Sequence, residues 1–226
     1  MVTPETINLG LGEPDMAPPS IAVEAMADAA RQGFNKYGPS AGIPELRQAI
    51  AFLNQRNNPQ LQADNILVTP SGTSGLLAIT QAFLDPGDEA LVPDPGFVLY
   101  EPHTILAGAK PRFYGLTEGD FQPDMDSIAE EVSGKTRLIY VNNPSNPTGS
   151  TLSQESYRAL CDLADDRGIV IVADEVYDRL VYEGEHRSFI DQLDKAVVVN
   201  SFSKTMAAPG WRIGYVAADQ SLMADL

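Results

Sequence analysis

Short apolar runs and amphipathic stretches alternate along the chain from residue 66 onward. The apolar runs are NILVTP, EALVPD, RLIYVNNP, GIVIVADE, AVVVNS and RIGYVAA, and helical patterns lie between many of them. Runs this continuously apolar are typical of strands that are covered on both faces. The pattern therefore predicts an α/β fold with a mostly parallel central sheet and helices on both of its faces.

Two helices are predicted before the first of these strands. Residues 20–33 and 43–56 carry Ala, Ile, Leu and Met at helical spacing, and the second stretch opens behind Gly42-Ile43-Pro44. A later helix is predicted in SQESYRALCDLADDRG, which holds the single cysteine, Cys161. The sequence contains no internal repeat and no flexible linker.

The last residues predict one more helix. Asp219 is a suitable cap, and Leu222, Met223 and Leu226 would share one apolar stripe. Neither a glycine nor a basic final turn closes this pattern, so we expect a C-terminally truncated sequence whose natural polypeptide continues. The alternative is a short terminal helix that docks on the core.

Composition and charge narrow the classes of partner. The 226 residues are 43% hydrophobic, which is enough for a substantial core. The 15 basic residues stand against 31 acidic ones, and the net charge of −16 disfavours nucleic acid and anionic membranes as partners. No apolar run reaches membrane-spanning length, and the single cysteine cannot form an internal disulfide. We expect a cytoplasmic protein.

Candidate chemistry gathers after three of the predicted strands. Asn142 and Asn146 follow RLIYV, Asp174 ends GIVIVAD, and Ser201 and Lys204 follow AVVVN. Ligands of parallel α/β sheets bind beyond the carboxyl ends of the strands, so an amide, a carboxylate and an amine would converge there. Any one of the Asn or Ser residues, taken alone, is more typical of a turn or a helix cap.

A second, weaker signal is the segment TPSGTSGLL, which follows a strand and opens a helix. Its backbone N–H groups suit an anion such as phosphate, although Ser and Gly are also ordinary capping residues. The two histidines, His103 and His186, are far apart, and the carboxylates lack ligand spacing, so no metal site is predicted.

The segment SFSKTMAAPGWRIGY resembles the lysine segment of class I/II aminotransferases, which are fold-type I pyridoxal-phosphate enzymes. The resemblance continues, in the order of the family, through GLGEPD, KYGPSAGIPELR, DPGDEALVPDPGF, NNPSNPTG and VADEVY, and it spans nearly the whole chain. It implies pyridoxal 5'-phosphate as cofactor. It also implies an N-terminal arm and first helix over residues 1–35 and a cofactor-binding large domain over residues 36–226, incomplete and without the family's C-terminal small domain.

The resemblance assigns roles around the cofactor ring. Lys204 matches the lysine that forms a Schiff base with the cofactor and moves the proton at the substrate Cα. Asp174 matches the carboxylate that pairs with the pyridine nitrogen. Asn146 and Tyr177 match donors to the ring oxygen, and Phe97 matches an aromatic residue stacked on the ring.

Other positions are implied to bind the phosphate and the substrate. The implied phosphate ligands are Ser71, Gly72, Thr73, Ser201 and Arg212. Tyr37 matches a tyrosine that reaches the phosphate of the neighbouring subunit, which implies a homodimer. Gly12 matches a backbone position that binds substrate.

The implied activity is transfer of an amino group between an L-amino acid and a 2-oxo acid. Two alternatives stay open: a pyridoxal-phosphate-dependent lyase or decarboxylase of the same fold, and a non-catalytic sensor domain. Thr73 stands where some bacterial aspartate aminotransferases have a lysine, so the amino acid is not identified. The family's arginine for the substrate carboxylate lies in the small domain, and we expect these 226 residues alone to be weakly active or inactive.

Overall fold

The computed structural model describes residue 7, residue 10 and residues 12–226. The other residues of the predicted N-terminal arm, with Leu11 of the GLGEPD motif, lie outside the described residues. The strands are β1 Ile66–Thr69, β2 Glu89–Asp94, β3 Lys110–Gly115, β4 Thr136–Asn142, β5 Val170–Asp174, β6 Ala196–Ser201 and β7 Gly214–Ala217. The α-helices are α1 Ser20–Arg31, α2 Pro44–Asn54, α3 Gly72–Phe83, α4 Tyr100–Leu106, α5 Met125–Glu131, α6 Gln154–Arg167, α7 Phe202–Thr205 and α8 Gln220–Met223.

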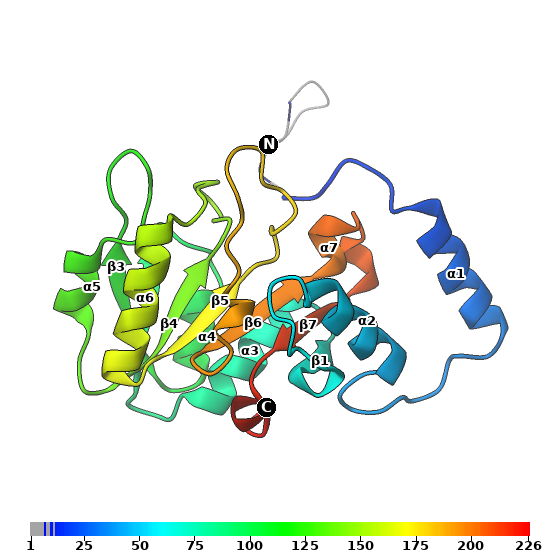
Figure 1. Ribbon diagram of the computed structural model, residues 1–226, viewed down its shortest axis with the longest axis horizontal. Coiled ribbons are helices and arrows are strands. Elements are labelled where there is room, and N and C mark those ends of the chain that lie inside the picture. Colours follow the sequence, from blue (N-terminus) through cyan, green and yellow to red (C-terminus); the bar gives the residue numbers. More distant parts are fainter. Residues whose placement is uncertain (1–6, 8–9, 11) are drawn as a thin grey trace.

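The strands form one sheet in the order β1-β7-β6-β5-β4-β2-β3 (Figure 1). β3, β2, β4, β5 and β6 pair in parallel, whereas β7 runs antiparallel to both of its neighbours, β1 and β6. The predicted mostly parallel sheet is therefore confirmed, with one reversed strand inserted between β1 and β6.

Helices cover both faces of this sheet, as the apolar runs predict. Alternate residues of β4 face opposite cores, with Ile139 in one and Tyr140 in the other. The first core is completed by α2, α5 and α6, and the second by α3 and α4. Because both faces are buried, the central strands have no polar side until they reach their carboxyl ends.

Local signals explain where the helices begin and end. The Ser153 side chain accepts a hydrogen bond from the Ser156 N–H at the start of α6, and Gly168, with φ of 63°, ends the helix in the left-handed region. Asp219 accepts from the Ser221 N–H at the start of α8. Leu222, Met223 and Leu226 then pack against the second core, so the predicted helix forms and its apolar stripe contacts the core.

β3 is the one strand in the described residues that the apolar pattern does not predict. It lies at the edge of the sheet and carries Lys110, Pro111 and Arg112, and only Tyr114 among its side chains is fully buried. Charged residues and proline are typical of edge strands, because a strand with one partner needs less apolar surface.

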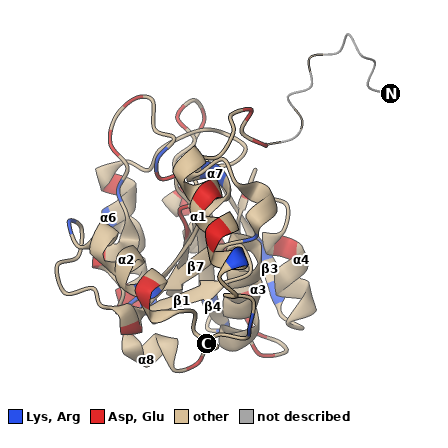
Figure 2. Cartoon of the chain, turned by 90° about the vertical axis from the view of Figure 1, so that its right-hand side faces the viewer, with Lys and Arg blue, Asp and Glu red and all other residues tan. Residues whose placement is uncertain are grey.

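The first helix stands apart from the sheet at one side of the molecule (Figure 1). None of the residues of α1 is buried, and Ile21 and Met26 are exposed. Figure 2 shows acidic positions on the same helix, where Asp28 forms an exposed ion pair with Arg31 at 2.8 Å. Within this chain, α1 therefore presents a surface with both apolar and charged side chains.

A close approach between β7 and the start of α3 depends on Gly214. A Cβ atom at this position would lie 2.5 Å from the backbone of both Ser71 and Gly72 and 2.9 Å from the carbonyl oxygen of Asn200. Backbone atoms on both sides cannot move without breaking the sheet or the helix start. Gly214 is thus required for the residues that surround the cavity described below to come together.

We predict that Gly214→Ala lowers the free energy of unfolding by at least about 2 kcal/mol, because the added methyl group overlaps backbone atoms. Gly134→Ala is the matched control, since a Cβ there meets nothing within 4 Å. Urea unfolding of the two variants followed by circular dichroism measures the difference. Equal midpoints for both variants would contradict the role given to Gly214.

Candidate active site

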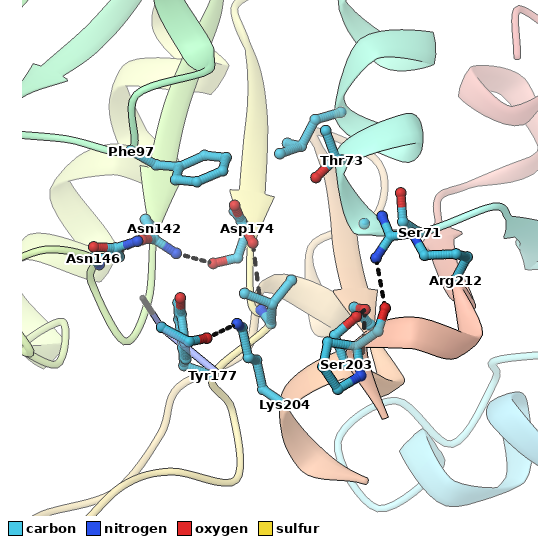
Figure 3. A pocket seen from close by; sticks show the side chains of 16 residues that line it. Ser71, Thr73, Phe97, Asn142, Asn146, Asp174, Tyr177, Ser203, Lys204 and Arg212 are labelled. Atoms are coloured by element: carbon cyan, nitrogen blue, oxygen red, sulfur yellow. Dashed lines mark hydrogen bonds between the residues drawn. The ribbon is translucent and has the colours of Figure 1, made fainter. Parts of the chain in front are cut away.

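A cavity of about 270 Å³ opens at the carboxyl ends of the central strands (Figure 3). All predicted site residues except Tyr37 line it: Gly12, Ser71, Gly72, Thr73, Phe97, Asn146, Asp174, Tyr177, Ser201, Lys204 and Arg212. The lining also includes Asn142 and Ser203. Segments that are distant in the sequence therefore meet at one edge of the sheet, as expected for a ligand site in this class of fold.

Strand register brings the polar ends together. Asn142, the last residue of β4, pairs with Asp174, the last residue of β5, and Asp174 in turn pairs with Val199 of β6. The Asn142 side chain donates a hydrogen bond of 2.8 Å to the Asp174 carbonyl oxygen. This bond fixes the backbone at the point where the Asp174 side chain enters the cavity.

The Asp174 carboxyl group is buried without a cationic partner among the described residues. The Tyr100 hydroxyl donates to its Oδ2 at 2.9 Å, and the Val176 N–H donates to its Oδ1 at 3.4 Å. Burial raises the pKa of Asp174 from its ordinary 3.8 to about 6, and these two hydrogen bonds oppose the rise. A positively charged group in the cavity would be stabilised next to this carboxylate.

Tyr100 is a site residue that the sequence reasoning missed. It begins α4, it is fully buried, and its ring stacks on Tyr140 at a centroid distance of 4.7 Å. Phe97 packs edge-on against it at 5.4 Å. Phe97 and Tyr100 are three residues apart, so one ring can face the cavity while the other places its hydroxyl group next to Asp174. Once the start of α4 is known, this spacing is the signal that could have indicated Tyr100.

Lys204 enters the cavity opposite these residues. Its ammonium nitrogen donates a hydrogen bond to the Gly12 carbonyl oxygen and lies 5.9 Å from the centroid of the Tyr177 ring. Burial lowers the pKa of Lys204, while the charge of Glu13 acts in the opposite direction. The amine is therefore partly desolvated, which favours its neutral and nucleophilic form.

The remaining wall suits an anion. Ser71 has a φ of 114° and caps α3 by accepting from the Ser74 N–H, so the first amides of α3, at Gly72 and Thr73, face away from the helix. First-turn amides have no acceptor within their own helix, and the helix dipole adds positive potential. Arg212, held in the left-handed region with φ of 54°, lies beside this helix start.

Asn146 and Tyr177 complete the side of the cavity near Lys204. The Asn146 N–H donates to the Asn142 side chain at 2.6 Å, which orders the loop after β4. Burial, followed by the charge of Asp174, raises the pKa of Tyr177, and the Asn146 side chain opposes this shift. Both side chains point into the cavity in Figure 3.

Tyr37 lies outside the cavity, in the connection between α1 and α2, and is fully exposed. Within the described residues, no three His, Cys, Asp or Glu side chains are grouped as a metal site requires. None of the helices there combines the length and the apolar run needed to cross a membrane.

The chain matches the family described as aminotransferase class I and II over residues 4–226. It belongs to this family. It is 40% identical to the probable aspartate aminotransferase of Methanocaldococcus jannaschii, covering 100% of this chain and 60% of that protein. It is 36% identical to aromatic-amino-acid aminotransferase 2 of Thermococcus litoralis, covering 95% and 57% of the two proteins.

Solved structures agree with this family membership. The aspartate aminotransferase of Thermus thermophilus with maleate is 37% identical, with a TM-score of 0.91, and the match covers 95% of this chain and 57% of that one. The chain thus spans about 60% of the length of these aminotransferases.

Class I and II aminotransferases use pyridoxal phosphate, and the cavity residues fit this cofactor. Among the residues that the structure describes, the buried Asp174 carboxylate has no cationic partner, so it can pair with a protonated ring nitrogen. The start of α3 with Arg212 offers donors for a phosphate, and the desolvated Lys204 amine lies between these two ends. The cavity is therefore polarised along its length in the manner that this cofactor requires.

We predict that Asp174→Asn stabilises the cofactor-free chain at neutral pH. Because the folded-state pKa is raised, the native protein holds a proton that the unfolded chain releases, so stability falls as pH rises from 3.8 to about 6. The variant avoids this loss, which amounts to about 3 kcal/mol at most. Urea unfolding at pH 4 and pH 8 measures it. If the variant were less stable than the wild type at pH 8, the conclusion that Asp174 is an unpaired buried charge would be wrong.

Proposed function

We propose that this chain is the cofactor-binding part of a pyridoxal-phosphate-dependent aminotransferase that moves an amino group between an L-amino acid and a 2-oxo acid. The observation that carries the proposal is the joint position of the Lys204 amine and the Asp174 carboxylate in one cavity whose far wall suits a phosphate. Family membership supports the same activity.

Each residue has a distinct task in this proposal. The bound cofactor supplies an aldehyde for the amino group and a ring that accepts the electrons released at the substrate Cα. Lys204, whose pKa is lowered by burial, would offer a neutral amine to the aldehyde of the bound cofactor and would take and return the Cα proton. Asp174 holds a proton on the ring nitrogen, and Tyr100 orients Asp174 through its hydroxyl group.

The other cavity residues bind and orient the cofactor. Asn146 and Tyr177 donate to the oxygen on its ring, and Phe97 packs on the ring face. The phosphate is held by the amides at the start of α3 and by hydroxyl and guanidinium groups, contributed by Ser71, Gly72, Thr73, Ser201 and Arg212. The Gly12 backbone binds the substrate. Rigid placement of these groups aligns the bond that breaks with the cofactor ring.

The amino acid is proposed only as a class. Relatives named for aspartate and for aromatic amino acids are similarly close to this chain, so similarity does not separate these substrates. Thr73 offers a hydroxyl and an amide rather than a cationic side chain toward the cavity. We therefore propose an L-amino acid donor without assigning its side chain.

We also propose a homodimer in which Tyr37 contacts the phosphate of the neighbouring subunit. Its full exposure and its distance from its own cavity support this role. The buried free thiol of Cys161 supports a cytoplasmic location. The division into an arm with the first helix, residues 1–35, and a cofactor-binding domain, residues 36–226, stays a prediction.

The assignment of Lys204 is tested by reductive trapping. Pyridoxal phosphate is added, borohydride is used to reduce the mixture, and mass spectrometry locates the added mass. We expect it on the peptide that contains Lys204, and we expect Lys204→Ala to abolish it. Lys195→Ala is the control. That lysine is not part of the cavity lining, and its ammonium group forms an ion pair of 2.5 Å with Asp165. Unchanged labelling in Lys204→Ala would overturn the proposal.

The role of Tyr37 is tested by asking whether its effect on cofactor binding requires two subunits to associate. We expect Tyr37→Phe to weaken pyridoxal phosphate binding about tenfold, because a hydrogen bond to a charged phosphate is lost. Tyr182→Phe, at a second exposed tyrosine, should leave binding unchanged. The effect should vanish at protein concentrations where sedimentation shows monomers. An effect that persists in the monomer would mean that Tyr37 does not act across a subunit boundary.

A further inference from the structure

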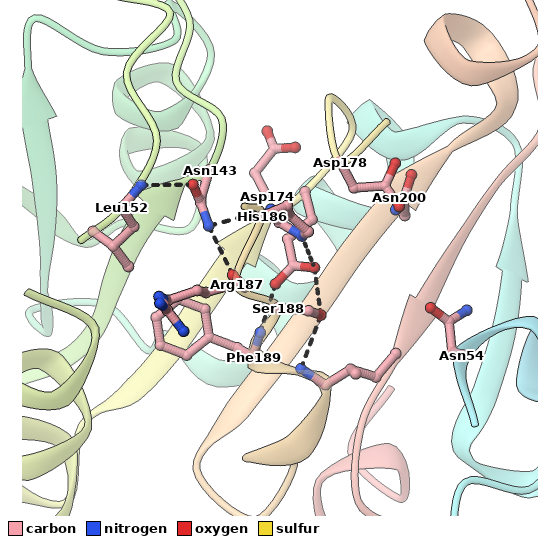
Figure 4. Close-up of polar contacts among 12 residues, drawn as sticks. Asn54, Asn143, Leu152, Asp174, Asp178, His186, Arg187, Ser188, Phe189 and Asn200 are labelled. Carbon is pink, nitrogen blue, oxygen red and sulfur yellow. Dashed lines mark hydrogen bonds and ion pairs between the residues drawn. The ribbon is translucent and has the colours of Figure 1, made fainter. Parts of the chain in front are cut away.

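A second buried carboxyl group belongs to Glu175, the residue that follows Asp174 at the end of β5. Figure 4 shows the residues that contact it, His186, Ser188 and Phe189. Glu175 is only 2% exposed. Its Oε2 accepts from the Ser188 hydroxyl at 2.6 Å and lies 3.1 Å from His186 Nε2, and its Oε1 accepts from the Phe189 N–H at 2.7 Å. His186 is the one basic side chain within 4.0 Å of this carboxylate in the described residues. The net charge of the Glu175–His186 pair thus depends on whether His186 is protonated.

The surroundings of His186 fix that protonation. Its Nδ1 lies 3.4 Å from the side-chain nitrogen of Asn143. The amide of Asn143 cannot be turned over, because its oxygen accepts from the Leu152 N–H at 2.9 Å and its nitrogen donates to the Arg187 carbonyl at 2.7 Å. An NH₂ group therefore faces His186 Nδ1, a contact that favours a lone pair on that nitrogen. This arrangement places the ring proton on Nε2, toward Glu175.

With His186 in this form, the Glu175 carboxyl group has three neutral donors: the Ser188 hydroxyl, the Phe189 N–H and the His186 Nε2–H. Glu175 is adjacent in sequence to Asp174, and both carboxyl groups are buried. Burial is the main cause of the raised pKa of Asp174, and the charge of Glu175 adds to it. The nearby Asp178 carboxylate pairs with Arg179, whose Nε lies 3.4 Å away, so this arginine does not neutralise Glu175. The end of β5 thus concentrates negative charge behind the cavity.

We propose that Glu175 is a positioning residue that acts through Asp174, and that its ionised carboxylate increases the preference of the cavity for a protonated cofactor ring. This inference rests on the proposed function. A carboxylate balanced by a protonated histidine would add little field, whereas one held by neutral donors retains its full charge in a region of low dielectric. In this proposal a neutral His186 holds the Glu175 carboxylate in place and leaves its charge uncompensated.

The competing explanation is that Glu175 only anchors the loop of residues 181–189. Two variants separate these roles. Glu175→Gln removes the charge with little change of shape, whereas Ser188→Ala removes one neutral donor from the same carboxylate and leaves its charge. Both weaken the anchor, but only the first changes the field at Asp174.

The readout is binding of two compounds to the full chain, followed by the fluorescence of its single tryptophan, Trp211, beside Arg212. One compound is pyridoxal phosphate, and the other is its deaza analogue, in which a CH group replaces the ring nitrogen. General damage to the cavity would weaken the binding of both compounds equally, so it would not change the ratio of their dissociation constants. We expect Glu175→Gln to shift this ratio against pyridoxal phosphate about fivefold or more, and Ser188→Ala to leave it unchanged.

An unchanged ratio in Glu175→Gln, or an equal shift in Ser188→Ala, overturns the proposal. Absence of binding of both compounds to the wild-type chain counts instead against the proposed function. If Glu175→Gln does not fold, imidazole nitrogen NMR on the wild type decides. The protein has two histidines, so His103→Asn assigns the signals. A neutral His186 protonated on Nε2 at pH 7 supports the proposal, and a doubly protonated ring overturns it.

Discussion

The site depends on one constraint: the Asp174 carboxylate is buried with no cation paired to it in the part of the chain that the structure describes. A fully buried charge of this kind is costly, and the fold tolerates it only because the Tyr100 hydroxyl and the Val176 amide donate to it and because strand register fixes its backbone. The core around it is otherwise continuous and apolar on both faces of the sheet. Above the pKa of about 6, the protein therefore keeps an unpaired charge at the end of its most buried strands.

The opposite end of the cavity has the reverse polarity. In a chain of net charge −16, a phosphate is attracted only where the local potential differs from that of the whole molecule. The start of α3 and Arg212 provide such a place, and Gly214 allows β7 to lie against that helix start. Lys204 stands between the two ends with its pKa lowered by burial. A ligand with an anionic group at one end and a basic ring at the other matches this gradient in a single orientation.

The sequence predicted most of this arrangement for identifiable reasons. Doubly buried strands produce long apolar runs, so six of the seven strands were visible, and the residues after those runs were the ones that line the cavity. β3 was missed because an edge strand can be polar, and the antiparallel direction of β7 was missed because strand direction leaves no mark on hydrophobicity. Tyr100 was missed because its importance lies in a contact between distant segments. Local patterns cannot encode such contacts.

The central position of β7 also has a consequence for synthesis. β1 pairs with β7 and with no other strand of the described residues, so Ile66–Thr69 has no sheet partner until residues 214–217 have left the ribosome. Once β6 has been made, it also keeps an open edge until β7 follows, and two unpaired edges on one nascent chain favour wrong pairing with other chains. The strand that closes the sheet is the same one that packs against the turn at the start of α3. The nascent polypeptide therefore cannot bind its cofactor before β7 has been made. Chaperone protection is most valuable while the stretch of about 145 residues between β1 and β7 is being translated.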